Sequence, residues 1–134
     1  MPVTVVIDTN FLVIPAQFSV DIFAETERVI ERGVEFVVLS SVLREIEMMA
    51  HDSESVAEQR TFRLALELTK RCKVVEYDPE EDLSVDEQIL VYAQSVGGVL
   101  ATNDRKLRDR AREKGVPVLR LRGKKTLSLE GVTF

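Results

Sequence analysis

The stretch Val3-Thr4-Val5-Val6-Ile7-Asp8-Thr9-Asn10 decides the fold class of this chain. Its first five residues are all β-branched and almost all apolar, which is typical of a strand covered on both faces within a parallel sheet. Asp8, Thr9 and Asn10 follow this strand at once. In an open α/β sheet the ligand crevice lies outside the carboxyl ends of the strands, so these three polar residues are the first candidates for a functional site.

Four later runs have the same apolar, β-branched character and predict four more strands. They cover residues 34–39, 74–77, 98–102 and 116–121. Segments with helical spacing of apolar residues lie between them, at 21–32, 41–51, 55–71, 84–96 and 104–114. Strands that alternate with helices predict an α/β fold in which a parallel sheet lies between two helical layers. We therefore expect a three-layer α/β/α sandwich with a central five-stranded parallel sheet. The tail after Gly123 is a candidate for a short edge strand.

Length and composition predict one domain that spans residues 1–134. Hydrophobic residues make up 45% of the chain and charged residues 31%, a globular balance that argues against disorder and low complexity. No apolar stretch approaches the roughly 20 residues that span a bilayer, and we expect neither membrane contact nor a secretory signal. Cys72 is the only cysteine, which excludes an internal disulfide and fits a cytoplasmic protein.

Charge is distributed unevenly along the chain. Residues 104–125 hold ten Lys and Arg against three acidic residues, a net charge of +7, so the rest of the chain carries −12 to give the formal total of −5. An acidic body with one basic segment repels polyanions in general, yet admits one along a single track. Arg105, Lys106 and Arg108 are the candidates for contact with a nucleic-acid backbone. The alternative from charge alone is a solvated helix face with i,i+4 ion pairs.

Four acidic residues from distant segments lie at or shortly after the ends of expected strands. They are Asp8, Glu45, Asp86 and Asp104. Because the carboxyl ends of parallel strands share one edge of the sheet, these carboxylates can converge there. Taken singly, each also has a structural explanation, as a turn residue, a surface residue on a helix or an acid at a helix start. Their common placement is what favours a site.

The identity of two of these acids is open at the level of sequence. Glu45 and Glu47 flank the apolar face of the same expected helix, and the helical wheel does not choose between them. Near Asp86, the neighbouring residues Asp82 and Glu87 are alternatives.

Carboxylates gathered within a few ångströms need compensation for their charge. Two like charges at about 4 Å repel by about 4 kcal/mol at an effective dielectric constant of about 20. Either some pKa values rise or a hard divalent cation lies between the groups. Oxygen ligands favour Mg²⁺ or Mn²⁺ over zinc, and His51 and Cys72 are far from the four acids in sequence. The basic segment begins at Asp104, so a bound nucleic-acid backbone would pass beside the metal.

Four short segments carry a resemblance to a known family. They are Val6-Ile7-Asp8-Thr9-Asn10-Phe11-Leu12, Ser41-Val42-Leu43-Arg44-Glu45-Ile46, Val85-Asp86-Glu87-Gln88-Ile89-Leu90 and Ala101-Thr102-Asn103-Asp104-Arg105-Lys106-Leu107. In order and spacing they resemble the PIN domain, a family of metal-dependent ribonucleases of about this length. The resemblance covers nearly the whole chain.

The resemblance implies a sheet of five parallel strands in the order 3-2-1-4-5. It also implies an Mg²⁺ or Mn²⁺ site in which the catalytic and metal-binding residues are Asp8, Glu45, Asp86 and Asp104. Asn10 and Thr102 match positions where polar side chains support that site or its water. The family's chemistry is hydrolysis of RNA by metal-activated water, which leaves a 5′-phosphate and a 3′-hydroxyl.

Two branches of the family fit, and they imply different partners. One processes ribosomal RNA and has archaeal relatives, which implies a ribosome-assembly partner. The other comprises the VapC-like toxins of toxin–antitoxin pairs, which implies an antitoxin. The opening Asp8-Thr9-Asn10-Phe11-Leu12 and the segment 14–23 resemble the first branch slightly more, as ancestry and not as evidence of substrate. Phe18 and Phe23 are candidates for contact with a partner or with a second copy in a homodimer, although core packing is the favoured alternative.

Two other functions are weighed against the ribonuclease. The first is a PIN-like module that binds RNA or protein without turnover. The second is an Asp-based phosphatase or phosphoacceptor domain, since both place an Asp after the first strand. The phosphatase needs an acid two residues beyond Asp8, where Asn10 stands. The phosphoacceptor needs a paired acid before the first strand and a lysine at a strand end, and the sequence has neither.

Overall fold

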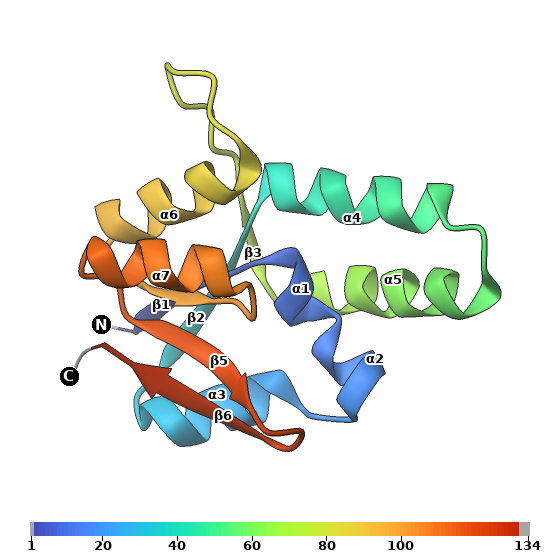
Figure 1. Cartoon of the computed structure of the whole chain (residues 1–134), viewed down its shortest axis with the longest axis horizontal. Coiled ribbons are helices and arrows are strands. Elements are labelled where there is room, and N and C mark those ends of the chain that lie inside the picture. The colour runs from blue at the N-terminus through green and yellow to red at the C-terminus, as the bar shows by residue number, and fades with distance from the viewer. Residues whose placement is uncertain (1, 132–134) are drawn as a thin grey trace.

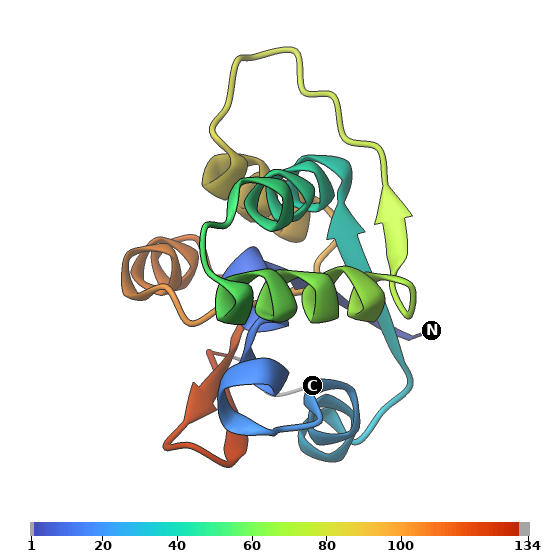
Figure 2. The ribbon, with the colours of Figure 1, turned by 90° about the vertical axis from the view of Figure 1, so that its right-hand side faces the viewer.

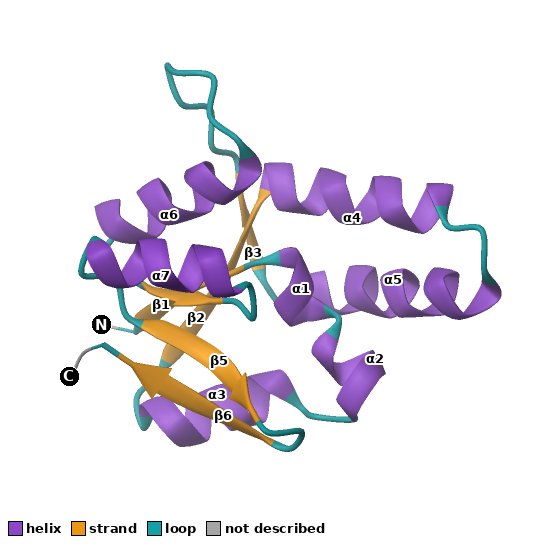
Figure 3. Ribbon diagram, in the orientation of Figure 1, coloured by secondary structure: helices purple, strands orange, loops and turns teal. Residues whose placement is uncertain are grey.

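The computed structural model describes residues 2–131. In chain order its elements are β1 (Val3–Ile7), α1 (Thr9–Leu12), α2 (Ile14–Phe18), α3 (Ile22–Ile30), β2 (Val34–Leu39), α4 (Ser40–Asp52), α5 (Val56–Thr69), β3 (Lys73–Val75), α6 (Val85–Ser95), β4 (Val99–Ala101), α7 (Arg105–Glu113), β5 (Val118–Arg122) and β6 (Thr126–Glu130). Strands and helices alternate as the sequence predicts, and Figure 3 shows the strands at the centre with helices around them. No helix within residues 2–131 is long and apolar enough to cross a membrane.

The sheet has six strands in the order β3-β2-β1-β4-β5-β6. The first five are parallel in the expected order, so that prediction is confirmed. The sixth pairs antiparallel with β5 and forms the expected edge strand after Gly123. Ile7 pairs with Ala101, and Ala101 in turn with Leu119, so β1 and β4 end at the same level while β5 continues beyond them. This shared edge is where the polar side chains gather.

Helices cover both faces of the sheet, which gives the expected three layers. α6 contacts β1 and β4, and α7 contacts β5, on one face. α3 contacts β2 and β6 on the other face. α4 and α5 pack against each other and extend past the carboxyl edge of the sheet (Figure 1). The apolar run of β1 is the centre of the core, because Val5, Val6 and Ile7 are fully buried.

The segment after β1 differs from the sequence-based expectation. Two short helices, α1 and α2, lie where the periodicity of the sequence predicts no element. They contain only four and five residues, which is too short for an amphipathic pattern to show. Asp8 caps α1 and Pro15 lies in the first turn of α2, and both are favourable local signals for helix starts.

Some strands differ from their predicted bounds by one or two residues. β5 begins at Val118 rather than at residue 116. Pro117 has no N–H to donate, although its carbonyl accepts a bond from the Leu100 N–H at 2.9 Å. β3 is the short stretch Lys73–Val75, so residues 76 and 77 belong to the loop that leads to α6. That loop, residues 76–84, projects from the body of the molecule at the carboxyl edge (Figure 1).

Candidate active site

Asp8 lies at the centre of the site and is 5% exposed. Its Oδ1 accepts a hydrogen bond from the Thr9 N–H at 2.7 Å, and its Oδ2 accepts one from the Thr102 hydroxyl at 2.8 Å. The pKa of the Asp8 carboxyl is raised to about 6, and burial is the main cause. The two hydrogen bonds lower this pKa, whereas the charges of Asp86 and Glu45 add to the increase. A buried carboxylate in this environment favours a cation as its partner.

A polar network joins the end of β1 to the end of β4. The Asn10 side-chain oxygen accepts hydrogen bonds from the Asn103 N–H at 2.9 Å and from the Thr102 hydroxyl at 3.3 Å. The Thr102 hydroxyl also accepts from the Asp104 N–H at 3.1 Å. Asn10 and Thr102 therefore fix the loop in which Asp104 lies. The resemblance implied a supporting role for both residues at the site, and that role stays a prediction.

Glu45 reaches the site because α4 starts directly at the end of β2. Its Oε1 accepts a hydrogen bond from the Thr9 hydroxyl at 2.7 Å. Glu47 lies on the same helix but is exposed and does not line the pocket. The rotation of α4 against the sheet thus decides which of the two glutamates lines the pocket, a choice that the helical wheel left open. Thr9 was one of the three polar residues after β1 that the sequence marked as candidates, and its hydroxyl joins Glu45 to the end of β1.

Asp86 and Asp104 come from the first turn of α6 and from the start of α7. Asp104 caps α7, because its Oδ1 accepts the Leu107 N–H at 3.1 Å. Burial raises the pKa of Asp86, the charges of Asp104 and Glu45 add to the increase, and Arg110 opposes it. Like charges from separate elements therefore act on one another across the site.

The four carboxylates line one pocket of about 320 Å³. Its lining comprises Asp8, Thr9, Asn10, Val13, Glu45, Met49, Phe62, Asp86 and Asp104. Asp82 and Glu87, the alternatives to Asp86, are not part of it. The apolar side of the pocket was missed by sequence reasoning. Met49 lies four residues after Glu45 on α4 and was detectable by that spacing, whereas Phe62 of α5 had no local signal.

The donor set of this pocket suits a hard cation. It contains only oxygen donors, and His51 is exposed and paired with Asp52 at 2.9 Å. Among residues 2–131, no three acidic, histidine or cysteine side chains are grouped as ready ligands of a single ion. The arrangement brings together four acidic side chains, of which Asp8 is buried and the other three are partly exposed, with free carboxylate oxygens.

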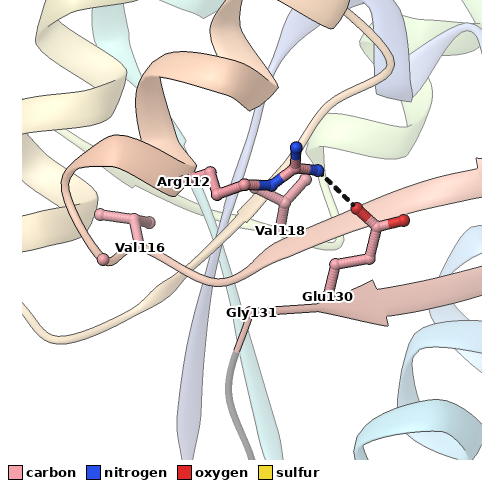
Figure 4. Close-up of a pocket in the computed structure, with 6 residues that line it drawn as sticks. Arg112, Val116, Val118, Glu130 and Gly131 are labelled. Carbon is pink, nitrogen blue, oxygen red and sulfur yellow. Dashed lines mark hydrogen bonds and ion pairs between the residues drawn. The ribbon is translucent and has the colours of Figure 1, made fainter.

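The expected nucleic-acid contacts lie at the start of α7. Arg105 and Lys106 are exposed, and Arg108 is half-buried. The Arg108 Nε is buried without a hydrogen-bond partner among the described residues. Arg112, further along the helix, turns to Glu130 and donates to its Oε2 at 3.2 Å (Figure 4).

The two phenylalanines proposed for partner contacts have different surroundings. Phe23 is 2% exposed and packs edge-on against Phe36 with ring centroids 4.8 Å apart, so it belongs to the core. Phe18 is 36% exposed at the end of α2.

Comparison with known families matches residues 5–124 to the PIN-like domain. The chain belongs to the PIN-like domain family. This PIN-like domain is 32% identical over 130 residues to "Ribonuclease VapC4" of Methanocaldococcus jannaschii, an alignment that covers 96% of this chain and 97% of the relative. It is 33% identical over 129 residues to "Ribonuclease VapC9" of Archaeoglobus fulgidus, covering 93% of this chain and 87% of the relative.

Solved structures show the same fold. The PIN domain endonuclease Utp24 superposes with a TM-score of 0.78 and 22% identity, covering 98% of this chain and 93% of the other. VapBC2 from Rickettsia felis, bound to a DNA fragment from its promoter, gives a TM-score of 0.64 with 12% identity, covering 89% and 99%. The fold expected from the sequence is thus shared by both of these solved structures.

Proposed function

We propose that this PIN-like domain is an endoribonuclease that depends on Mg²⁺ or Mn²⁺ and uses Asp8, Glu45, Asp86 and Asp104 to hold the ion. The observation that carries the proposal is the convergence of these four carboxylates, from four elements, on one pocket. The two curated relatives are named ribonucleases, which supports RNA as the substrate.

The residues present fit a hard divalent ion by their chemistry. Asp8 keeps an unused lone pair on each carboxylate oxygen, and Asp104 keeps the oxygen that does not cap α7. We assign these two as direct ligands, with Glu45 and Asp86 binding directly or through water. A bound Mg²⁺ or Mn²⁺ ion supplies a hydroxide-like water and neutralises charge on the phosphodiester.

The other side chains of the site position these groups. Thr102 and Thr9 donate to Asp8 and Glu45 and so hold the carboxylate planes in place. Arg105 and Lys106 lie at the start of α7, directly after Asp104, where they bind the phosphate backbone beside the cleaved bond. Val13, Met49 and Phe62 form an apolar wall that limits access of bulk water.

The test is cleavage of single-stranded RNA in the presence of Mg²⁺ or Mn²⁺, with EDTA as the negative control. We expect products with a 5′-phosphate and a 3′-hydroxyl, and loss of cleavage in Asp8→Asn without loss of the fold by circular dichroism. Undiminished cleavage by Asp8→Asn contradicts the assignment.

A second candidate is a PIN-like module that binds RNA without turnover. It is favoured by the absence, within residues 2–131, of three side chains grouped as ligands of one ion. Calorimetry with Mn²⁺ separates the two candidates. Binding of RNA together with no heat of Mn²⁺ binding at millimolar concentration supports the module, and saturable Mn²⁺ binding that Asp8→Asn removes supports the ribonuclease.

Of the two branches, we propose the VapC-like one, with an antitoxin as partner. Both curated relatives are named VapC, and their alignments with this chain cover nearly its whole length. Growth arrest on expression of the chain, relieved by Asp8→Asn, is the expected outcome. Expression without effect on growth, together with cleavage of ribosomal RNA precursors in vitro, supports the ribosomal branch and a ribosome-assembly partner instead.

A further inference from the structure

The acidic pocket lies at a boundary between two segments of opposite charge. Residues 74–104 contain eight Asp and Glu and no Lys, Arg or His. Residues 105–125 contain ten Lys and Arg against two acids, a net charge of +8. The change of sign occurs between Asp104, which lines the pocket, and Arg105, which is the first residue of α7.

The topology separates these two charges on opposite sides of the pocket. The acidic loop, residues 76–84, follows β3 at one side of the sheet, and the hairpin between β5 and β6 lies at the other side. Both leave the sheet at its carboxyl edge, where Asp8 follows the last residue of β1. In Figures 1 and 2 the yellow loop and the red hairpin lie on opposite sides of α1.

Hydrogen bonds connect the base of the hairpin directly to the pocket. The Leu121 N–H of β5 donates to the Asn103 side-chain oxygen at 2.9 Å, and the Asn103 N–H donates to the Asn10 side-chain oxygen at 2.9 Å. Asn10 is part of the pocket lining. Two hydrogen bonds therefore connect the hairpin to Asn10 in the pocket lining.

Only some cations of the basic segment are available to a ligand. Glu130 accepts hydrogen bonds from Arg112 at 3.2 Å (Figure 4) and from Arg120 at 2.6 Å, so its single negative charge is shared between these two cations. Five exposed cations lie from the pocket to the hairpin turn, and none of them forms an ion pair with another residue in the range 2–131. These are Arg105, Lys106, Arg122, Lys124 and Lys125.

The acidic loop presents the opposite surface. Glu76, Asp78, Glu80, Glu81 and Asp82 are exposed, and Arg44 is the only cation in the depression of about 320 Å³ that the loop forms with α4 and α6, among the described residues. A phosphate backbone that leaves the pocket on this side meets like charge, and salt screens this repulsion little within the Debye length of about 10 Å.

We propose that the RNA backbone is bound on one side of the cleaved phosphodiester only, along a track formed by Arg105, Lys106, Arg122, Lys124 and Lys125. The acidic loop repels the strand on the other side, so the enzyme requires several nucleotides in one direction and almost none in the other. This inference rests on the proposed ribonuclease activity and specifies how its substrate is held.

The first experiment measures RNA binding without turnover. Anisotropy of a labelled 12-nucleotide single strand is recorded in EDTA over a range of salt concentrations. For Lys124→Gln/Lys125→Gln we expect about tenfold weaker binding at low salt and a salt slope smaller by about 1.4, because two phosphate contacts are lost. The matched control is Lys73→Gln/Lys114→Gln, which removes the same charge from two exposed lysines outside the proposed track, at the start of β3 and at the end of α7.

The second experiment tests the asymmetry. An oligonucleotide with a mapped cleavage position is shortened one nucleotide at a time from either end, with Mn²⁺ present. We expect KM to rise severalfold on shortening from one end only, and this dependence to disappear in Lys124→Gln/Lys125→Gln. In Glu80→Gln/Glu81→Gln we expect binding of the longer strands to tighten about threefold, because repulsion beyond the pocket is reduced.

The possible failures of the two proposals differ. Equal dependence on both ends, or equal RNA affinity of the hairpin variant and its control, overturns the one-sided track while leaving the ribonuclease intact. No cleavage of any strand in Mg²⁺ or Mn²⁺ overturns the ribonuclease, and the one-sided track fails with it.

Discussion

The hydroxyl of Thr102 donates a hydrogen bond to Oδ2 of Asp8 at 2.8 Å, across 94 positions of the sequence. Both residues are buried, and each follows a central strand of the sheet. The bond joins the β1 and β4 ends and lowers the pKa of a carboxyl that burial would otherwise raise further. It makes Thr102 a positioning residue for Asp8.

Thr102→Val is expected to destabilise the fold by about 1–3 kcal/mol, because it leaves a buried carboxylate and the Asp104 N–H each without one partner. Urea denaturation at pH 7 in EDTA measures the effect. Thr126→Val is the matched control, because Thr126 is exposed and its hydroxyl donates to the Arg122 carbonyl at 3.2 Å. A change at Thr102 no larger than that at Thr126 shows that the bond to Asp8 is unimportant.

Asp8→Asn is expected to stabilise the ion-free protein near pH 7. Burial raises the pKa of Asp8 from 3.8 to about 6 in the folded state. The neutral Asp8 carboxyl therefore contributes fully to the free energy of unfolding below about pH 4, and this contribution is lost as the pH rises through about 6. Between these two pH values, the free energy of unfolding of the wild-type protein should fall by about 2–3 kcal/mol relative to that of the variant.

Chemical denaturation of both proteins in EDTA, from pH 4 to pH 7.5, measures this difference. Two parallel stability curves across this range would mean that Asp8 ionises as an exposed carboxyl does. Because Asn keeps an oxygen for the Thr9 N–H, the comparison isolates the charge from the helix cap.

Glu45→Gln is expected to weaken Mn²⁺ binding at least about tenfold, because it removes one negative oxygen from the pocket. Glu47→Gln, two residues along α4 and outside the pocket, should leave the affinity unchanged. Calorimetric titration with Mn²⁺ gives both affinities. Equal losses in the two variants would point to a general effect of helix charge, and no loss in either would remove Glu45 from the ligand set.

Gly98→Ala is expected to cost about 1–3 kcal/mol of stability, because a Cβ at this position would lie 2.8 Å from the Thr4 carbonyl oxygen of β1. The backbone must shift to accept it. Gly33→Ala is the matched control, since its Cβ would meet no atom closer than 4.0 Å. Thermal unfolding of both variants measures their melting temperatures. An equal decrease in the two would contradict the prediction for Gly98.

Much of the fold was predictable because its signals are local. The β-branched run of β1 and the helical spacing of α3 to α7 are properties of short windows, and the predicted elements are found there. α1 and α2 were missed because they are too short to show a period. The bounds of β3 and β5 shifted because ladder pairing, not composition, decides where a strand ends.

The candidate site was predictable only as a set of carboxylates that follow strands. Asp8 and Asp104 follow β1 and β4 directly, so the parallel order of the sheet brings them to one edge. Glu45 lies a full turn into α4, and its place in the pocket depends on the rotation of that helix. Phe62 closes the pocket from α5, and no feature of its own segment indicates this.

The order of residues alone determined the alternation of elements, the polar ends of the strands and the reversal of charge after Asp104, because each is written in neighbouring positions. Only the packed structure decided which glutamate faces Asp8, how far Asp8 is removed from water, and which arginines remain free of Glu130. Those properties depend on contacts between segments far apart in the chain, and such contacts exist only once helices and sheet are packed together.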